Sequence, residues 1–194
     1  MKKIFLTLLT VIFCASAFSQ TVESIRKDYA EAMNHAKMMN DPEYPPTNRF
    51  QVVTEQMMAG SGPHKVSATF YYFEDEEDMN PGNVQKSIWY VTYSYNWAAR
   101  DYYEEYLYNE KGKIEFIYER GYDDDFQVYE NRFYFDTKGI IKVIVKRKKE
   151  DDNAFTQEYS GATVTAKYKA AYDSAVNKSE YFKTMFKTLD TFSN

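Results

Sequence analysis

Two changes of hydrophobic period divide the chain into three parts. In residues 21–39, apolar side chains recur every three or four positions, which is the period of a helix that packs on one side. From Arg49 to about residue 148 the period is two, as in strands that bury one face. The helical period returns from about Val164 to Leu189. The pattern therefore predicts a helix, a sheet and a second helix.

The middle part predicts about seven strands joined by short polar links. The clearest strand alternates strictly, with Trp89, Val91, Tyr93, Tyr95 and Trp97 on one face. Links of a few residues join antiparallel neighbours, so the strands form a meander. We expect the strands at residues 49–57, 65–73, 86–97, 101–109, 113–120, 126–135 and 140–148.

Two of the expected hairpins share their turn chemistry. Asn109 and Asp136 suit the start of a type I turn, and Gly112 and Gly139 suit the left-handed residue that closes a three-residue hairpin. This turn pairs Asn109 with Lys113, and Asp136 with Ile140. Counting outward pairs Tyr108 with Ile114, Tyr106 with Phe116, Phe135 with Ile141 and Phe133 with Val143. The opposite face then receives Glu105, Glu115, Glu119, Arg132, Lys142 and Lys146.

The architecture follows from the need to cover an apolar sheet face. The two helices are the available cover. We expect an α+β domain, a curved antiparallel β-meander of about seven strands with the N-terminal and C-terminal helices packed on one face. Asn177-Lys178-Ser179 interrupts the second helix, where Ser179 suits the cap of a new start. The strands end in the charge run KRKKEDD, and the stretch that follows it, NAFTQEYSG at residues 153–161, is interpreted as irregular.

The two hairpins also resemble segments of a loose group of uncharacterised exported bacterial proteins. In that group, hairpins of the form YYFD–GKLIR precede a C-terminal helix, and the matching segments here are Tyr106–Ile117 and Arg132–Ile144. Ile140-Ile141 departs from the group's pattern. The resemblance implies an exported domain of unknown function, and it provides no site residues because its motif is turn chemistry.

The first nineteen residues have the pattern of a secretory signal peptide. Lys2 and Lys3 precede the apolar run Ile4–Phe13, and small residues then suit a cleavage site after Ser19. We expect a signal peptide at 1–19, a single domain at 20–194, and a periplasmic or secreted location. Cys14, the one cysteine, falls within the leader, and lipid attachment there is disfavoured because Phe13 precedes it.

Net charge argues against two classes of partner. The full chain carries −5, and removal of Lys2 and Lys3 with the leader takes it to −7. Nucleic acids and anionic lipids are bound through an excess of Lys and Arg, so neither is an expected partner. After the leader, no segment is long and apolar enough to predict a membrane span.

Motifs for catalysis or metal binding are missing from the sequence. His35 and His64 are far apart, and zinc, G-x-S-x-G and phosphate-loop spacings are absent. The acidic runs Glu74–Asp78 and Asp123–Asp125 lack the alternating ligands of an EF-hand. We therefore expect no catalytic residue, metal ligand or cofactor. Paired carboxylates for glycoside hydrolysis remain open and would come from Glu104, Glu115, Glu119 and Glu130.

Aromatic residues supply the candidate binding surface. The chain holds 19 Tyr and 14 Phe, and the hairpin register puts Tyr90, Tyr103 and Tyr134 on the face away from the predicted core. Leu107, Ile117 and Ile144 join them there. An uncovered face of this kind would bind a protein, peptide or glycan. The alternative is a helix on each face, or a cover formed by residues 149–163.

Three classes of function remain open. In order of preference they are an exported non-catalytic binding or accessory protein, a small apolar-ligand carrier with a pocket between sheet and helices, and a glycan-directed hydrolase built on the scattered carboxylates. The sequence does not specify the ligand, the partner or the oligomeric state.

Overall fold

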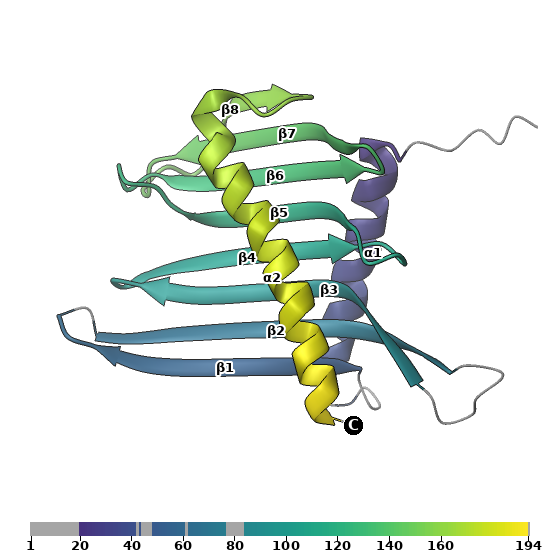
Figure 1. The fold of residues 1–194 in the computed structure, drawn as a ribbon. Coiled ribbons are helices and arrows are strands. Elements are labelled where there is room, and N and C mark those ends of the chain that lie inside the picture. The colour runs from purple at the N-terminus through teal and green to yellow at the C-terminus, as the bar shows by residue number, and fades with distance from the viewer. Residues whose placement is uncertain (1–19, 42, 44–47, 61, 77–83, 194) are drawn as a thin grey trace, which may run out of the picture.

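The computed structural model describes residues 20–41, 43, 48–60, 62–76 and 84–193, and shows an eight-stranded antiparallel sheet between two helices (Figure 1). The leader predicted for residues 1–19 lies outside the described residues, as does part of the acidic run Glu74–Asp78. No described helix is long and apolar enough to cross a membrane. The elements are α1 (Val22–Met39), β1 (Arg49–Met58), β2 (Gly62–Glu76), β3 (Val84–Trp97), β4 (Arg100–Tyr108), β5 (Ile114–Tyr122), β6 (Val128–Asp136), β7 (Gly139–Lys148), β8 (Thr156–Gly161), the 3₁₀ turn η1 (Ala166–Tyr168) and α2 (Lys169–Ser193).

The strands follow one another in chain order from β1 to β8, so the predicted meander is confirmed. The sheet has eight strands rather than seven. The added strand, β8, pairs with β7 and forms one edge of the sheet. Its sequence, TQEYSG, lacks the apolar alternation that marks a buried strand, so the segment was expected to be irregular. The structure agrees that most of these residues are exposed, as an edge strand allows.

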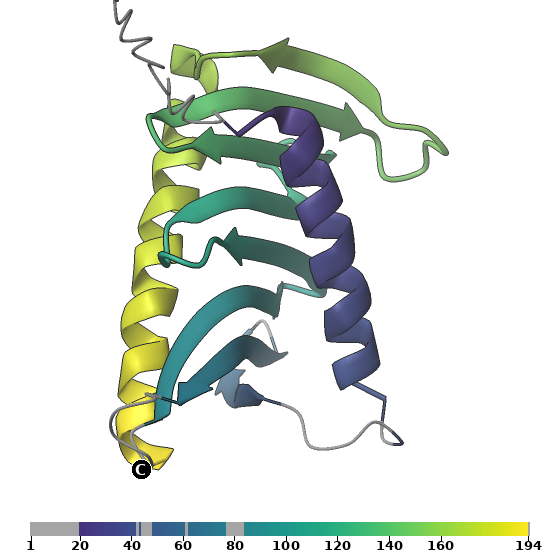
Figure 2. The ribbon, with the colours of Figure 1, turned by 90° about the vertical axis from the view of Figure 1, so that its right-hand side faces the viewer.

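The two helices lie on opposite faces of the sheet (Figure 2). The expectation that both pack on one face is wrong, and the alternative of a helix on each face is what the structure shows. The physical reason is that the strands carry large apolar side chains on both faces, and each set needs a cover. Under α2 lie Phe70, Val91, Tyr106, Ile117, Phe133 and Val143, and under α1 lie Tyr71, Tyr90, Leu107, Phe116, Tyr134 and Ile144.

Helix α2 runs without a break through Asn177-Lys178-Ser179, where an interruption was expected. The Ser179 hydroxyl donates to the Val176 carbonyl at 2.7 Å instead of capping a new helix. The Ser179 carbonyl accepts a hydrogen bond from the Tyr108 hydroxyl at 2.8 Å. The bond from Tyr108 ties the middle of α2 to the end of β4.

The first predicted turn is confirmed. The Asn109 amide donates to the Lys113 carbonyl at 2.9 Å, and the Gly112 amide donates to the Asn109 carbonyl at 2.7 Å. Gly112 has φ +67° and Gly139 has φ +131°, so both glycines use backbone conformations that other residues avoid. In the second hairpin, Asp136 pairs with Gly139 rather than with the predicted Ile140.

Beyond the turns, β-bulges change the register that turn counting predicts. Tyr108 pairs with Ile114 as expected, but Glu115 is then left out of the ladder and Leu107 pairs with Phe116. In the same way, Ile141 is left out between β6 and β7, and Trp89 is left out between β2 and β3. At this end of the sheet β3, β5 and β7 therefore each carry one extra residue, and a fourth bulge leaves Glu158 of β8 out of its ladder with β7.

Each of the bulges in β3, β5 and β7 places two consecutive side chains on the α1 face. Trp89 and Tyr90 pack in the same cluster under α1, and Ile141 packs against that cluster. Glu115 accepts a hydrogen bond from Gln20, next to the start of α1, and its neighbour Phe116 lies under the same helix. The predicted faces of Trp89, Phe116, Ile117, Glu119 and Ile141 are wrong for this reason, and Trp89 does not share a face with Val91 and Tyr93.

We predict that Gly139→Val lowers the free energy of unfolding by about 1–3 kcal/mol, because valine must adopt a strained φ near +131°. A Cβ at this position meets no atom within 4 Å, so steric crowding does not contribute. The measurement is urea unfolding, with Lys138→Val in the same turn as the control. Equal losses in the two variants would contradict the assigned backbone conformation.

Candidate functional site

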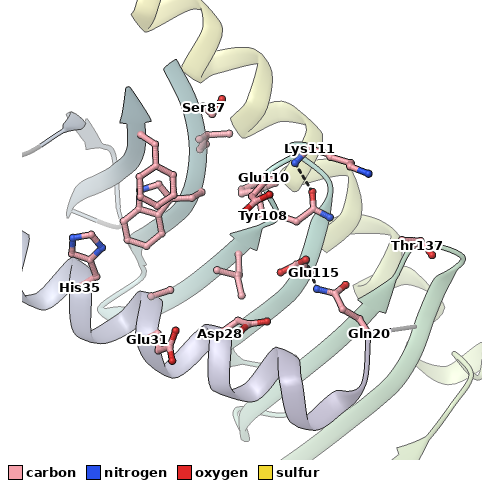
Figure 3. A pocket seen from close by; sticks show the side chains of 16 residues that line it. Gln20, Asp28, Glu31, His35, Ser87, Tyr108, Glu110, Lys111, Glu115 and Thr137 are labelled. Carbon is pink, nitrogen blue, oxygen red and sulfur yellow. Dashed lines mark hydrogen bonds between the residues drawn. The ribbon is translucent and has the colours of Figure 1, made fainter. Parts of the chain in front are cut away.

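A cleft of about 640 Å³ lies between α1 and the bulged end of the sheet (Figure 3). This volume falls within the range of small-molecule sites, roughly 300–1,000 Å³. One wall comes from α1 and the other from the ends of β2 to β5. The lining residues are Gln20, Asp28, Glu31, Ala32, His35, Phe73, Ser87, Ile88, Trp89, Leu107, Tyr108, Asn109, Glu110, Lys111, Glu115 and Thr137.

Helix α1 presents one flank to the cleft while its apolar stripe packs on the sheet. Asp28, Glu31 and His35 are spaced so that they lie on the same side of the helix, and Figure 3 shows all three on the cleft wall. The start of the helix is fixed by a capping box in which Thr21 and Ser24 bond each other's backbone amides, each at 3.1 Å. The position of these polar side chains is therefore set by a well-terminated helix.

Trp89 enters the cleft wall because of the bulge in β3. Its side chain is almost fully buried, with 6% of its surface exposed. The His35 ring stacks on it at 5.3 Å between centroids, and the Phe73 ring stacks at 5.4 Å. The indole Nε1 hydrogen is buried and has no acceptor among the described residues. A buried donor without a partner lowers the stability of a fold by about 1–3 kcal/mol. The Trp89 N–H is therefore an unusual group for this wall.

Glu115 enters the same cleft because of the bulge in β5. It is buried, and its carboxylate accepts a hydrogen bond from the side-chain amide of Gln20 (Figure 3). Burial raises the pKa of the Glu115 carboxyl above its usual value, while the hydrogen bond from Gln20 opposes this rise. The bulges thus bring Trp89, whose buried donor is unpaired, and the desolvated carboxyl of Glu115 to the wall of one cleft.

Neither Trp89 nor Glu115 was among the ligand contacts predicted from the sequence. Tyr90 and Tyr134 lie under α1, each 1% exposed, so the open aromatic face expected from them is not found. Tyr103 is 37% exposed and its hydroxyl donates to Glu105 at 2.7 Å. The three tyrosines do lie on the face that the sequence assigned to them, but α1 covers this face, whereas the sequence placed both helices on the other one.

The two histidines and the acidic run Asp123–Asp125 form no shared site. His35 lies against Trp89, whereas His64 lies on β2 with its ring 5.6 Å from that of Trp97. The Asp123 carboxylate accepts hydrogen bonds from the backbone amides of Asp125 at 3.1 Å and Gln127 at 2.9 Å. These bonds stabilise the turn between β5 and β6. In the part of the chain that the structure describes, no group of three or more His, Cys, Asp or Glu is placed to hold a metal ion.

Two of the four candidate catalytic carboxylates do meet. Glu104 and Glu119 face each other across β4 and β5 on the α2 face, and both are buried. Lys178 extends from α2 between them, with its ammonium against the Glu104 carboxylate and 3.4 Å from a Glu119 oxygen. Glu115 lies in the α1 cleft, and Glu130 accepts from the Tyr118 hydroxyl at 3.0 Å.

The remaining oxygens of this carboxylate pair are also occupied. The Tyr106 hydroxyl donates to Glu104 at 2.5 Å, and the Asn131 amide donates to Glu119 at 3.2 Å. A glycosidase needs space between its carboxyls for the sugar and a water, and here an ammonium group of the protein fills that space. The arrangement stabilises the packing of α2 and offers no substrate site.

Sequence reasoning missed Lys178 because it lies in the expected interruption of the helix. Its position in the sequence does indicate that it faces the sheet. Lys178 lies three residues after Ala175 and four before Phe182, and both of these are on the buried stripe of the helix. A lysine on an apolar stripe indicates a buried acidic partner.

We predict that Lys178→Met destabilises the fold by about 3–5 kcal/mol at pH 7, because it leaves two buried carboxylates without their cation. Lys169→Met, which removes an exposed ion pair on the same helix, is the control and is expected to cost about 0.5 kcal/mol or less.

This loss depends on pH in a defined direction. Burial raises the pKa of Glu119 in the folded protein, so its protonated form is favoured there, and the penalty grows as pH rises through that pKa. The deficit of Lys178→Met should therefore shrink between pH 7 and pH 5, as measured by urea unfolding at each pH. A deficit that is constant or larger at pH 5 would contradict the assigned cluster.

Comparisons with protein-family models, curated proteins and solved structures found no match. The resemblance to exported bacterial proteins therefore remains an expectation, and the candidate site rests on its geometry.

Proposed function

We propose that this chain is an exported, non-catalytic binding protein that holds a small organic ligand in the cleft between α1 and the bulged end of the sheet. The single observation that carries the proposal is the Trp89 indole N–H, which is buried in the cleft wall with no acceptor among the described residues. Native structures pair nearly all buried donors, and a bound ligand supplies the missing acceptor.

The cleft lining favours binding over catalysis. A nucleophile needs a base within hydrogen-bond reach. Among the described lining residues, Glu115 accepts side-chain hydrogen bonds from the amides of Gln20 and Asn109, and the Lys111 backbone amide donates to Asn109 at 3.0 Å. None of these bonds activates a hydroxyl, and the His35 ring is stacked against Trp89. The groups on the wall are suited to contact a ligand rather than to transfer its protons.

The exported location is supported by the sequence. Lys2, Lys3 and the apolar run Ile4–Phe13 have the order of a secretory leader. No thiol follows Cys14 in the chain, so residues 20–194 would have no disulfide to form in an oxidising compartment.

A small apolar-ligand carrier is the second candidate. It is supported by a pocket of about 290 Å³ between α2 and the sheet at β1 to β3. Its wall includes Val52, Val66, Phe182 and Met185. We rank it second because the pocket is smaller, and because its wall contains no buried polar group without a partner among the described residues.

We predict that ligand binding changes the fluorescence of Trp89. Trp97→Phe removes the half-exposed second indole and leaves Trp89 as the one tryptophan of the chain. This variant is titrated with three probes that share a phenyl group, namely phenethylamine, 2-phenylethanol and phenylacetate. We expect a saturable change in Trp89 emission with at least one of them.

A cleft-blocking variant tests where the probe binds. Ser87→Phe adds a ring at an exposed position of the cleft wall and should abolish the change, while Ser94→Phe, at an exposed position of the same strand outside the cleft, should preserve it. The absence of a saturable response to all three probes, or an unaltered response in Ser87→Phe, would overturn the proposed function.

A further inference from the structure

The charged residues that line the cleft are mostly acidic. Asp28 and Glu31 come from α1, Glu110 from the turn after β4, and Glu115 from the bulge of β5, while Lys111 is the one lysine or arginine on the wall (Figure 3). A concave site lined by one sign of charge concentrates ligands of the opposite sign. The cleft therefore attracts cations and repels anions.

Among the acidic residues of the cleft, Glu115 is the one whose carboxylate a cationic ligand would stabilise most. Its carboxyl is buried, and the donors that the structure gives it are the neutral side-chain amides of Gln20 and Asn109. A charged donor binds a carboxylate roughly twice as strongly as a neutral one. An ammonium group in the cleft would therefore improve on the bond that Gln20 provides.

The α2 face shows how the same fold treats buried carboxylates when no ligand is involved. There Glu104 and Glu119 are joined by the ammonium of Lys178, which comes from the chain itself. The described residues that line the α1 cleft include Lys111, but no ion pair joins Lys111 to Glu115 among the described contacts. The cleft has the carboxylates of such a cluster without its internal cation.

Trp89 adds an independent requirement. Four acidic residues line the same cleft, yet none of them accepts the buried indole hydrogen. The indole is held in place by stacking on His35 and Phe73, so it cannot turn toward a carboxylate without losing these contacts. A ligand must therefore bring an acceptor of its own to Trp89, beside the apolar side chains of Ile88 and Leu107.

We infer that the ligand is a small organic ammonium compound that carries a hydrogen-bond acceptor next to a compact apolar group, an inference that rests on the proposed function. Its ammonium group binds the carboxylates of Glu115, Asp28 and Glu31. Its hydroxyl or carbonyl oxygen accepts the Trp89 hydrogen. Its apolar group lies on Ile88 and Leu107.

Four probes with one phenyl group separate these requirements. They are 2-amino-1-phenylethanol, with ammonium and hydroxyl; phenethylamine, with ammonium alone; 1-phenyl-1,2-ethanediol, which is neutral; and mandelate, which is anionic. Dissociation constants are measured by calorimetry on the unchanged protein. We expect the amino alcohol to bind about tenfold more tightly than phenethylamine or the diol, and mandelate to bind most weakly.

Variants assign each preference to its residue. Glu115→Gln should weaken the two ammonium probes about tenfold and leave the diol unchanged. Trp89→Phe keeps an aromatic ring and should remove the advantage of the amino alcohol over phenethylamine. Glu180→Gln, on α2 and away from the cleft, is the control and should change none of the four constants.

The outcomes separate the inference from the proposed function. If the diol or mandelate binds as well as the amino alcohol, the ammonium assignment is overturned and the binding cleft remains. If the amino alcohol and phenethylamine bind equally to the unchanged protein, the role of Trp89 is overturned. If none of the four probes binds, the proposed function fails with it.

Discussion

Three β-bulges at one end of the sheet shape the cleft that we propose as the binding site. An ordinary strand sends alternate side chains to opposite faces, whereas a bulge places two consecutive side chains on the same face. Trp89, Glu115 and Ile141 are the extra residues, and all three are on the α1 side. The first two line the cleft with groups that an unbulged sheet would not have brought together. The bulges therefore connect the fold to its candidate function.

The hydrophobic period predicted the helix, sheet and helix, and Asn109 and Gly112 predicted a turn that is found. The bulges were not predictable, because an extra residue such as Trp89 beside Tyr90 leaves the local aromatic pattern intact while shifting every pair beyond it. The placement of the helices failed because the sequence was interpreted as a sheet with one apolar face, whereas both faces carry large apolar side chains and each needs its own cover. The residues that line the cleft are spread along the chain from Gln20 to Thr137, so no local sequence motif could have predicted it.

The two faces of the sheet treat buried carboxylates differently. On the α2 face, Lys178 neutralises Glu104 and Glu119, and tyrosine and asparagine side chains complete the cluster. On the α1 face, Glu115 has a neutral partner in Gln20 and opens to a cleft. The first arrangement ties a helix to the sheet, and the second leaves a buried carboxyl with neutral hydrogen-bond donors at the edge of a cleft. Of the four carboxylates considered for hydrolysis, Glu104 and Glu119 thus belong to the Lys178 cluster, Glu115 lines the proposed binding cleft, and Glu130 belongs to neither.

The most direct test of this account is the NMR signal of the Trp89 indole N–H. The chain has two tryptophans, and the half-exposed Trp97 lies outside the cleft and serves as the internal reference. On addition of 2-amino-1-phenylethanol, the account predicts a saturable downfield shift of the Trp89 signal, as its hydrogen gains an acceptor, while the Trp97 signal stays in place. A Trp89 signal that does not move at saturating probe, or that moves together with that of Trp97, would contradict it.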